Sequence, residues 1–125
     1  MSSELLRKAA ALMRARAEKA TPGDYGFVSK WTTPNQMLTR ITQGGRVVAE
    51  SRSDGSNLHD LNHLSYWHPA VALAVADWLD KAITDYESAQ SEYEEECARG
   101  KYPYWTPQID SGAVAVARVY LGGDA

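Results

Sequence analysis

The sequence predicts a single α+β domain, and three patterns along it carry that prediction. Apolar side chains repeat at helical spacing over the first 20 residues, alternate as in strands over the next 30, and return to helical spacing after residue 57. A chain of 125 residues fits one compact domain and is too short for two of ordinary size. We therefore expect one domain over residues 1–125.

The N-terminal segment, from about Ser3 to Ala20, is predicted to form an amphipathic helix. Its apolar side chains fall on one stripe and its basic ones occupy much of the rest. The stripe consists of Leu5, Leu6, Ala9, Leu12, Met13 and Ala17. Thr21-Pro22-Gly23 then ends the helix, because proline lacks an amide hydrogen and glycine accepts a left-handed turn.

Three strands are predicted next, at Tyr25–Thr32, Gln36–Thr42 and Arg46–Ser51. Gln43-Gly44-Gly45 is the strongest turn signal, because its glycines can adopt the positive φ angles of a tight hairpin. Loops this short cannot carry parallel crossovers, so the strands should form an antiparallel meander. Such a sheet needs a helix over one of its faces.

Three further helices are predicted after the polar loop 52–57. A short one covers about Asn57 to Trp67, a long one runs from Pro69 to about Arg99, and a last one covers about Asp110 to Leu121. The start of the long helix and most of the last helix are apolar on nearly all sides, which predicts burial in the core. Both Trp67 and Trp78 can then face that core.

The distal half of the long helix carries a narrow apolar stripe. Its positions alternate steps of three and four, as on a coiled-coil seam: Leu79, Ala82, Tyr86, Ala89, Tyr93 and Cys97. This half should pack either against the N-terminal helix or against a second subunit. The second reading predicts a self-assembling module, a homodimer through residues 79–97.

Charge is distributed unevenly along the chain. Residues 1–20 carry five basic side chains against two acidic ones, whereas residues 77–99 carry eight acidic against two basic. The two helices can lie antiparallel with complementary faces, or the acidic one can dock on a basic partner or mimic nucleic acid. The net charge of −3 argues against a generic nucleic-acid binder, so nucleic acid is not an expected partner.

Aromatic side chains gather in the loop Lys101–Gln108, which holds two prolines. Large rings in such a loop form either a lid over the core or a contact surface. If the loop is exposed, it is the candidate binding patch for a partner. With the neighbouring acidic helix, the candidate residues are Tyr102, Tyr104, Trp105, Tyr86, Tyr93, Glu92 and Glu95.

Histidines in the short helix suggest a metal site. His59 and His63 are four residues apart and would share a helix face, a spacing by which two imidazoles hold one ion. Asp60 stands where the zinc-protease motif H-E-x-x-H has Glu, and its shorter side chain would not reach a metal-bound water in the same pose. His68 and Asp54 are the candidate third ligands. The alternative is a polar helix face, with no cofactor.

Other catalytic patterns are weak. Cys97 follows three glutamates, which disfavour the thiolate, and a single cysteine excludes an intramolecular disulfide. No P-loop or nucleophile elbow is present, so an enzyme is not the favoured reading. The N-terminus MSSELLRKAA lacks the apolar segment of a signal peptide, and no apolar run reaches about 18 residues. We therefore expect a cytoplasmic protein without a membrane partner.

Three stretches resemble small uncharacterised proteins of actinobacteria and their phages. LLRKAAALMRARAEKATPGDY is similar to their A-x-x-A-T-P-G-P-W start, with Asp24-Tyr25 in place of Pro-Trp. DLNHLSYWHPAVALAVADWLD, residues 60–80, resembles their D-A-x-H-I-A-x-x-x-P block, and AVAVARVYLG, residues 113–122, resembles their apolar tail. Together these stretches cover about half of the chain.

The resemblance implies a phage-encoded or prophage-encoded accessory protein, and it implies no activity. It places Asp60 and His63 on the Asp and His of the block and leaves His59 outside, so a site for zinc or another divalent metal would use Asp60, His63 and His68. The leading hypothesis is a non-enzymatic protein that binds and modulates a host protein in the host cytoplasm. The alternatives are a metal-dependent hydrolase or small-molecule binder at those three residues, and the self-assembling module.

Overall fold

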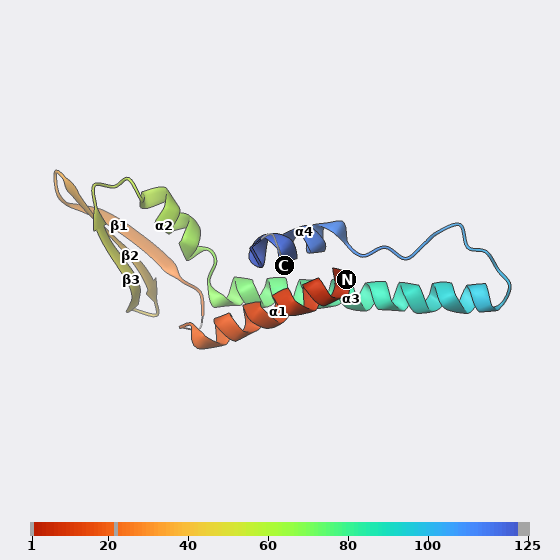
Figure 1. Ribbon diagram of the computed structural model, residues 1–125. Helices are drawn as coiled ribbons and strands as arrows, with labels where there is room; N and C mark the ends of the chain where they lie inside the picture. The colour runs from red at the N-terminus through yellow and green to blue at the C-terminus, as the bar shows by residue number, and fades with distance from the viewer. Residues whose placement is uncertain (1, 22, 123–125) are drawn as a thin grey trace. The chain divides into compact units, whose positions relative to one another are not determined.

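The computed structural model describes residues 2–21 and 23–122 and confirms the α+β class. The elements, in chain order (Figure 1), are α1 (Ser2–Lys19), β1 (Gly26–Thr33), β2 (Gln36–Gln43), β3 (Arg46–Ser53), α2 (Leu58–Ser65), α3 (Pro69–Ala98) and α4 (Ser111–Tyr120). Every boundary lies within two residues of its predicted position. The periodicities that predict these elements are local properties of the chain, which is why they locate the ends so closely.

The chain divides into two compact units. The first, here called the helical unit, contains Met1–Met13 and Ala74–Ala125, and the second, the sheet unit, contains Arg14–Leu73. Each boundary falls inside a helix, α1 or α3. The expectation of one domain stays a prediction, because two compact units joined by continuous helices can still unfold as one.

The sheet unit is built on an antiparallel meander in the order β1-β2-β3. The hairpin between β2 and β3 closes through Gly44-Gly45, whose φ angles of 55° and 85° confirm the predicted turn. Met37, Thr39 and Ile41 alternate along β2 and are buried on one face. Leu61 of α2 lines a small cavity together with Thr39 and Ile41, so α2 is the helix that covers this face.

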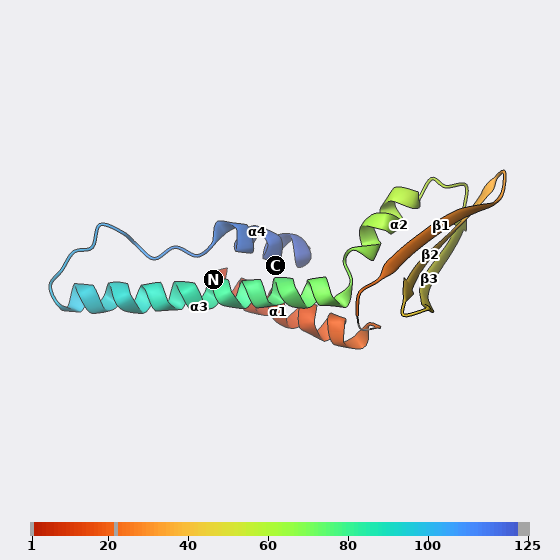
Figure 2. The same cartoon turned by 180° about the vertical axis from the view of Figure 1, so that it is seen from behind.

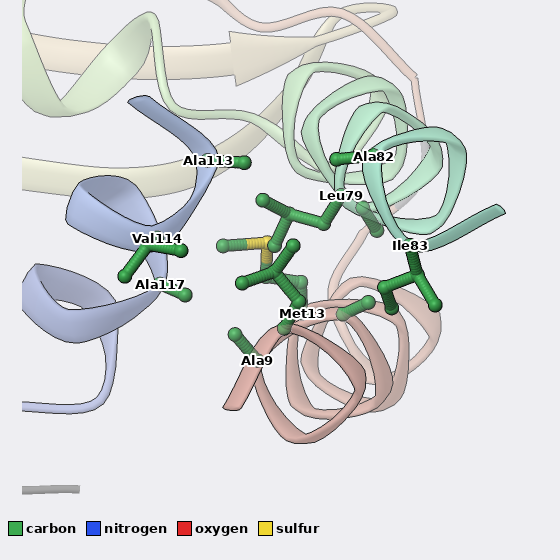
Figure 3. Close-up of a cluster of buried hydrophobic side chains, with 11 residues drawn as sticks. Ala9, Met13, Leu79, Ala82, Ile83, Ala113, Val114 and Ala117 are labelled. Atoms are coloured by element: carbon green, nitrogen blue, oxygen red, sulfur yellow. The ribbon is translucent and has the colours of Figure 1, made fainter. Parts of the chain in front are cut away.

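The helical unit has an apolar core formed where α1, α3 and α4 meet. Within this unit α1 runs antiparallel to α3 (Figures 1 and 2). Figure 3 shows Met13 of α1 and Leu79 of α3 between the helices, with Ala117 of α4 facing them. The buried cluster comprises Leu6, Ala9, Ala10, Met13, Ala76, Leu79, Ala82, Ile83, Ala113, Val114 and Ala117. The many alanines of this cluster have small side chains, which let the helix backbones approach closely. Leu6, Ala9 and Met13 come from the predicted N-terminal stripe.

The burial predicted for the apolar helices is wrong at several positions. Trp67 and Trp78 are 42% and 38% exposed, and Val119 near the end of α4 is 80% exposed. A unit of about 60 residues has too little volume to surround a helix on all sides, because surface grows relative to volume as size falls. Each helix therefore buries one stripe, and its remaining apolar residues face solvent.

Candidate partner-binding site

The candidate partner-binding residues lie on one part of the helical unit, here called the arm, residues 84–110. It consists of the distal half of α3 and a return segment, residues 99–110, that runs back along the helix (Figures 1 and 2). The rings of Trp105 and Tyr93 meet edge to face, with centroids 5.5 Å apart and planes at 68°. This geometry is favourable for aromatic pairs and holds the return segment against α3.

The reversal between helix and return segment is built by a glycine. Gly100 has φ of 80°, and its amide donates to the carbonyl of Cys97 at 3.0 Å, while the Lys101 amide donates to that of Glu96 at 3.0 Å. These two bonds form a Schellman motif, which satisfies carbonyls that the end of a helix would leave unpaired. The predicted helix stop at Gly100 is thereby confirmed.

The return segment alternates between buried and exposed side chains. The odd-numbered residues from Pro103 to Ile109 are half-buried, whereas the even-numbered ones from Tyr102 to Asp110 are exposed. Successive side chains of an extended chain point to opposite sides, so one set faces α3 and the other faces solvent. Tyr102 is 93% exposed and Tyr104 is fully exposed. The segment therefore has one side packed on α3 and one side that faces solvent, while the lid over the core and the contact surface stay predictions.

The helix side of the arm is strongly acidic. Residues 84–98 contain six acidic side chains and no basic one. Of the two predicted contact residues among them, Glu92 is exposed and Glu95 accepts a hydrogen bond from Arg99 at 2.5 Å. Near the start of this stretch Arg7 of α1 forms an ion pair with Glu87 at 2.7 Å, which realises the predicted complementarity of the two helices at one position.

A groove flanks the proximal end of the arm. Its cavity of about 510 Å³ is lined by Trp78, Lys81, Ala82, Asp85, Tyr86, Gln108, Ile109 and Asp110. A second cavity of about 330 Å³ shares Tyr86, Gln108 and Ile109 with the first among its lining residues. Tyr86 is among the predicted residues, whereas Trp78 is predicted to face the core and instead lines the groove. The spacing W-x3-A-x3-Y could have indicated the groove, because Ala82 leaves a gap between two rings on one helix face.

The apolar stripe on α3 is largely used inside the chain. Leu79 and Ala82 belong to the core, and Tyr93 packs on Trp105, while Cys97 at the distal end is exposed. The distal half of α3 thus packs on the return segment of the same chain. The sequence-based predictions named only the N-terminal helix or a second subunit. The homodimer through residues 79–97 stays a prediction.

The three candidate metal ligands lie in the sheet unit. Asp60 and His63 are exposed on α2, and Asp60 lies in its first turn, where Asn57 takes the N-cap position. His68 follows the helix, with its Nδ1 3.7 Å from an Asp24 carboxylate oxygen. Among residues 2–21 and 23–122, no three His, Cys, Asp or Glu side chains gather closely enough to hold an ion. The metal site therefore stays a prediction without geometric support.

Asp54, the other candidate ligand, is engaged locally. Its Oδ1 accepts a hydrogen bond from the Ser56 amide at 2.9 Å. Hydrogen bonds from Ser56, through its side chain first and its backbone second, lower the pKa of Asp54 from its usual 3.8. This pattern is that of an Asx-turn, which orders the loop before α2.

Comparison with protein-family models, curated proteins and solved structures finds no match to this chain. In the part of the chain that the structure describes, no helix is long and apolar enough to cross a membrane.

Proposed function

We propose that this chain is a non-enzymatic accessory protein, encoded by a phage or prophage, that binds a host protein through the arm. The observation that carries this proposal is the outward display of Tyr102 and Tyr104 on an anchored segment. The phage and host assignment rests on the resemblance of the N-terminal and central stretches to actinobacterial and phage proteins.

The tyrosines have the physical character of binding hot spots. A tyrosine brings a large ring and a hydroxyl to an interface at the cost of only two side-chain torsions, and tyrosines are enriched among hot-spot residues. Here the backbone between them is already restrained by Pro103 and by the packing of Trp105 on Tyr93. Less conformational entropy is then lost on binding than a free loop would lose.

The charge of the arm specifies the kind of partner. Residues 84–98 carry six acidic side chains, of which three are paired with Lys81, Arg7 and Arg99, so this part of α3 keeps an excess of negative charge. Such a surface speeds encounter with a positively charged partner and disfavours acidic ones. The expected partner surface is therefore basic, with an apolar recess for the tyrosine rings.

The test is affinity capture from an actinobacterial lysate, followed by a titration with the purified partner. The wild-type chain should retain one dominant protein, and Tyr102→Ala/Tyr104→Ala should weaken its affinity by about 30-fold or more, as expected for hot spots of about 2 kcal/mol. Asp85→Lys/Glu92→Lys/Glu95→Lys should slow association most at low salt.

The matched control is Leu64→Ala/Tyr66→Ala, which removes two side chains that are also exposed, but on the sheet unit. It should bind as the wild type does. Capture of nothing specific, or equal weakening by the control and by the tyrosine variant, would contradict the proposal.

A further inference from the structure

The sheet has a second face, opposite the one that α2 covers. Side chains alternate across a strand, so this face carries the even-numbered residues of β2 and their cross-strand partners. They form two rows, the first of Lys30, Leu38 and Arg52 and the second of Val28, Arg40 and Glu50. Leu38, whose cross-strand partners are Lys30 and Arg52, is only 5% exposed.

This face is basic within a chain whose total charge is negative. Its two rows carry three basic side chains, Lys30, Arg40 and Arg52, against the single acid Glu50. The sheet unit as a whole has seven basic and five acidic residues, a net +2, whereas the helical unit has six and eleven, a net −5. The net charge of −3, which argues against nucleic acid, therefore averages two units of opposite sign.

The positive groups keep much of their hydrogen-bonding capacity. The carboxylate of Glu50 is shared by two guanidinium groups, because its Oε1 lies 3.8 Å from Nη2 of Arg40 and 3.5 Å from Nη2 of Arg52. Both distances exceed the length of the usual charge-assisted hydrogen bond. The side chains of Arg40 and Arg52 are 42% and 57% exposed, so part of each guanidinium group faces solvent. Guanidinium groups placed in this way suit phosphate oxygens, which they bind in pairs.

We infer that this face of the sheet, centred on Lys30, Arg40 and Arg52, binds the phosphate backbone of double-stranded DNA. The outer strands of a three-stranded sheet are about 10 Å apart, so basic side chains on them can reach phosphates on the two sides of the major groove, which is about 12 Å wide. Sheets and ribbons are known to enter DNA grooves. Single strands need stacking rings, whereas Phe27 and Trp31 fall on the opposite face, in register with Ile41 and Met37.

The experiment is fluorescence anisotropy of a labelled 16-base-pair duplex of mixed sequence, titrated with the full chain in 50 and 200 mM NaCl. The wild type should bind at micromolar concentration in 50 mM NaCl and lose affinity on the order of 10²-fold at 200 mM, as expected for three or four phosphate contacts. Lys30→Glu/Arg52→Glu should weaken binding by roughly tenfold or more and reduce the salt slope by about 2.

The matched control is Lys8→Glu/Lys101→Glu, which changes the net charge equally but at exposed residues of the helical unit. It should stay within about threefold of the wild type, because neither residue belongs to the face that is proposed to contact the phosphates. A milder variant, Lys30→Gln/Arg52→Gln, should also lose affinity, and circular dichroism of both variants checks that they fold.

Three outcomes would overturn the inference. The first is no binding by the wild type at 50 mM NaCl. The second is an equal loss of affinity in Lys30→Glu/Arg52→Glu and in Lys8→Glu/Lys101→Glu, which would mean that binding depends only on the total charge of the chain. The third is self-association of the wild type, measured by sedimentation equilibrium without DNA, that Lys30→Glu/Arg52→Glu abolishes. That result would mean that the face binds a second copy of the chain.

Discussion

The two units of this chain differ in charge and in how they use aromatic side chains. The helical unit contains the acidic arm, on which two tyrosines are exposed. The sheet unit has a basic face, and the two rows of residues on this face contain no aromatic ring. One chain of modest net charge thus divides into two units of opposite net charge. Composition averages over such surfaces, so it is a poor guide to partners until the fold separates them.

The largest expected effect tests whether the units unfold together. Leu79→Ala removes a fully buried side chain where α1, α3 and α4 meet, and should lower the free energy of unfolding by about 3 kcal/mol. Urea unfolding measures this loss. If residues 1–125 form one domain, amide exchange in β2 should accelerate by the same free energy as exchange in α3.

A control variant and a contradicting outcome complete this test. Val119→Ala, at a largely exposed position, should change stability by less than about 0.5 kcal/mol. Protection of β2 that is unaffected by Leu79→Ala would show that the sheet unit unfolds independently and would contradict the single domain.

A smaller effect should separate the two sides of the return segment. Trp105→Ala removes the ring that packs on Tyr93 and should cost about 1–2 kcal/mol, with faster amide exchange over residues 84–98. Tyr104→Ala, one residue away on the exposed side, should cost less than about 0.5 kcal/mol. Equal costs for the two variants would show that the segment is not anchored through Trp105.

The smallest effect concerns the loop before α2. Because Ser56 lowers the pKa of Asp54, this interaction stabilises the folded state above the unfolded pKa of 3.8, and its contribution is lost as pH falls through the lower folded pKa. Ser56→Ala removes the largest cause and should raise the pKa of Asp54 toward 3.8. An NMR titration of the Asp54 carboxyl carbon measures the change, and Ser88→Ala serves as a control that should leave it unaltered.

Local order was predictable from the sequence by itself. The stop at Gly100, the hairpin at Gly44-Gly45 and the three strands depend on backbone freedom and on side-chain period within a few residues, so each element was located to within two residues. The candidate residues Tyr102 and Tyr104 were also found this way, because prolines and rings cluster in the sequence.

What only the tertiary structure decided is which of these residues are buried, paired or displayed. The groove beside Trp78, the packing of Trp105 on Tyr93 and the basic row of Lys30 and Arg52 join residues that are far apart in sequence. Burial depends on which segments come to lie side by side, and in two small units many apolar residues find no neighbour. The period of a sequence therefore determines its elements, whereas contacts between distant segments determine its surfaces.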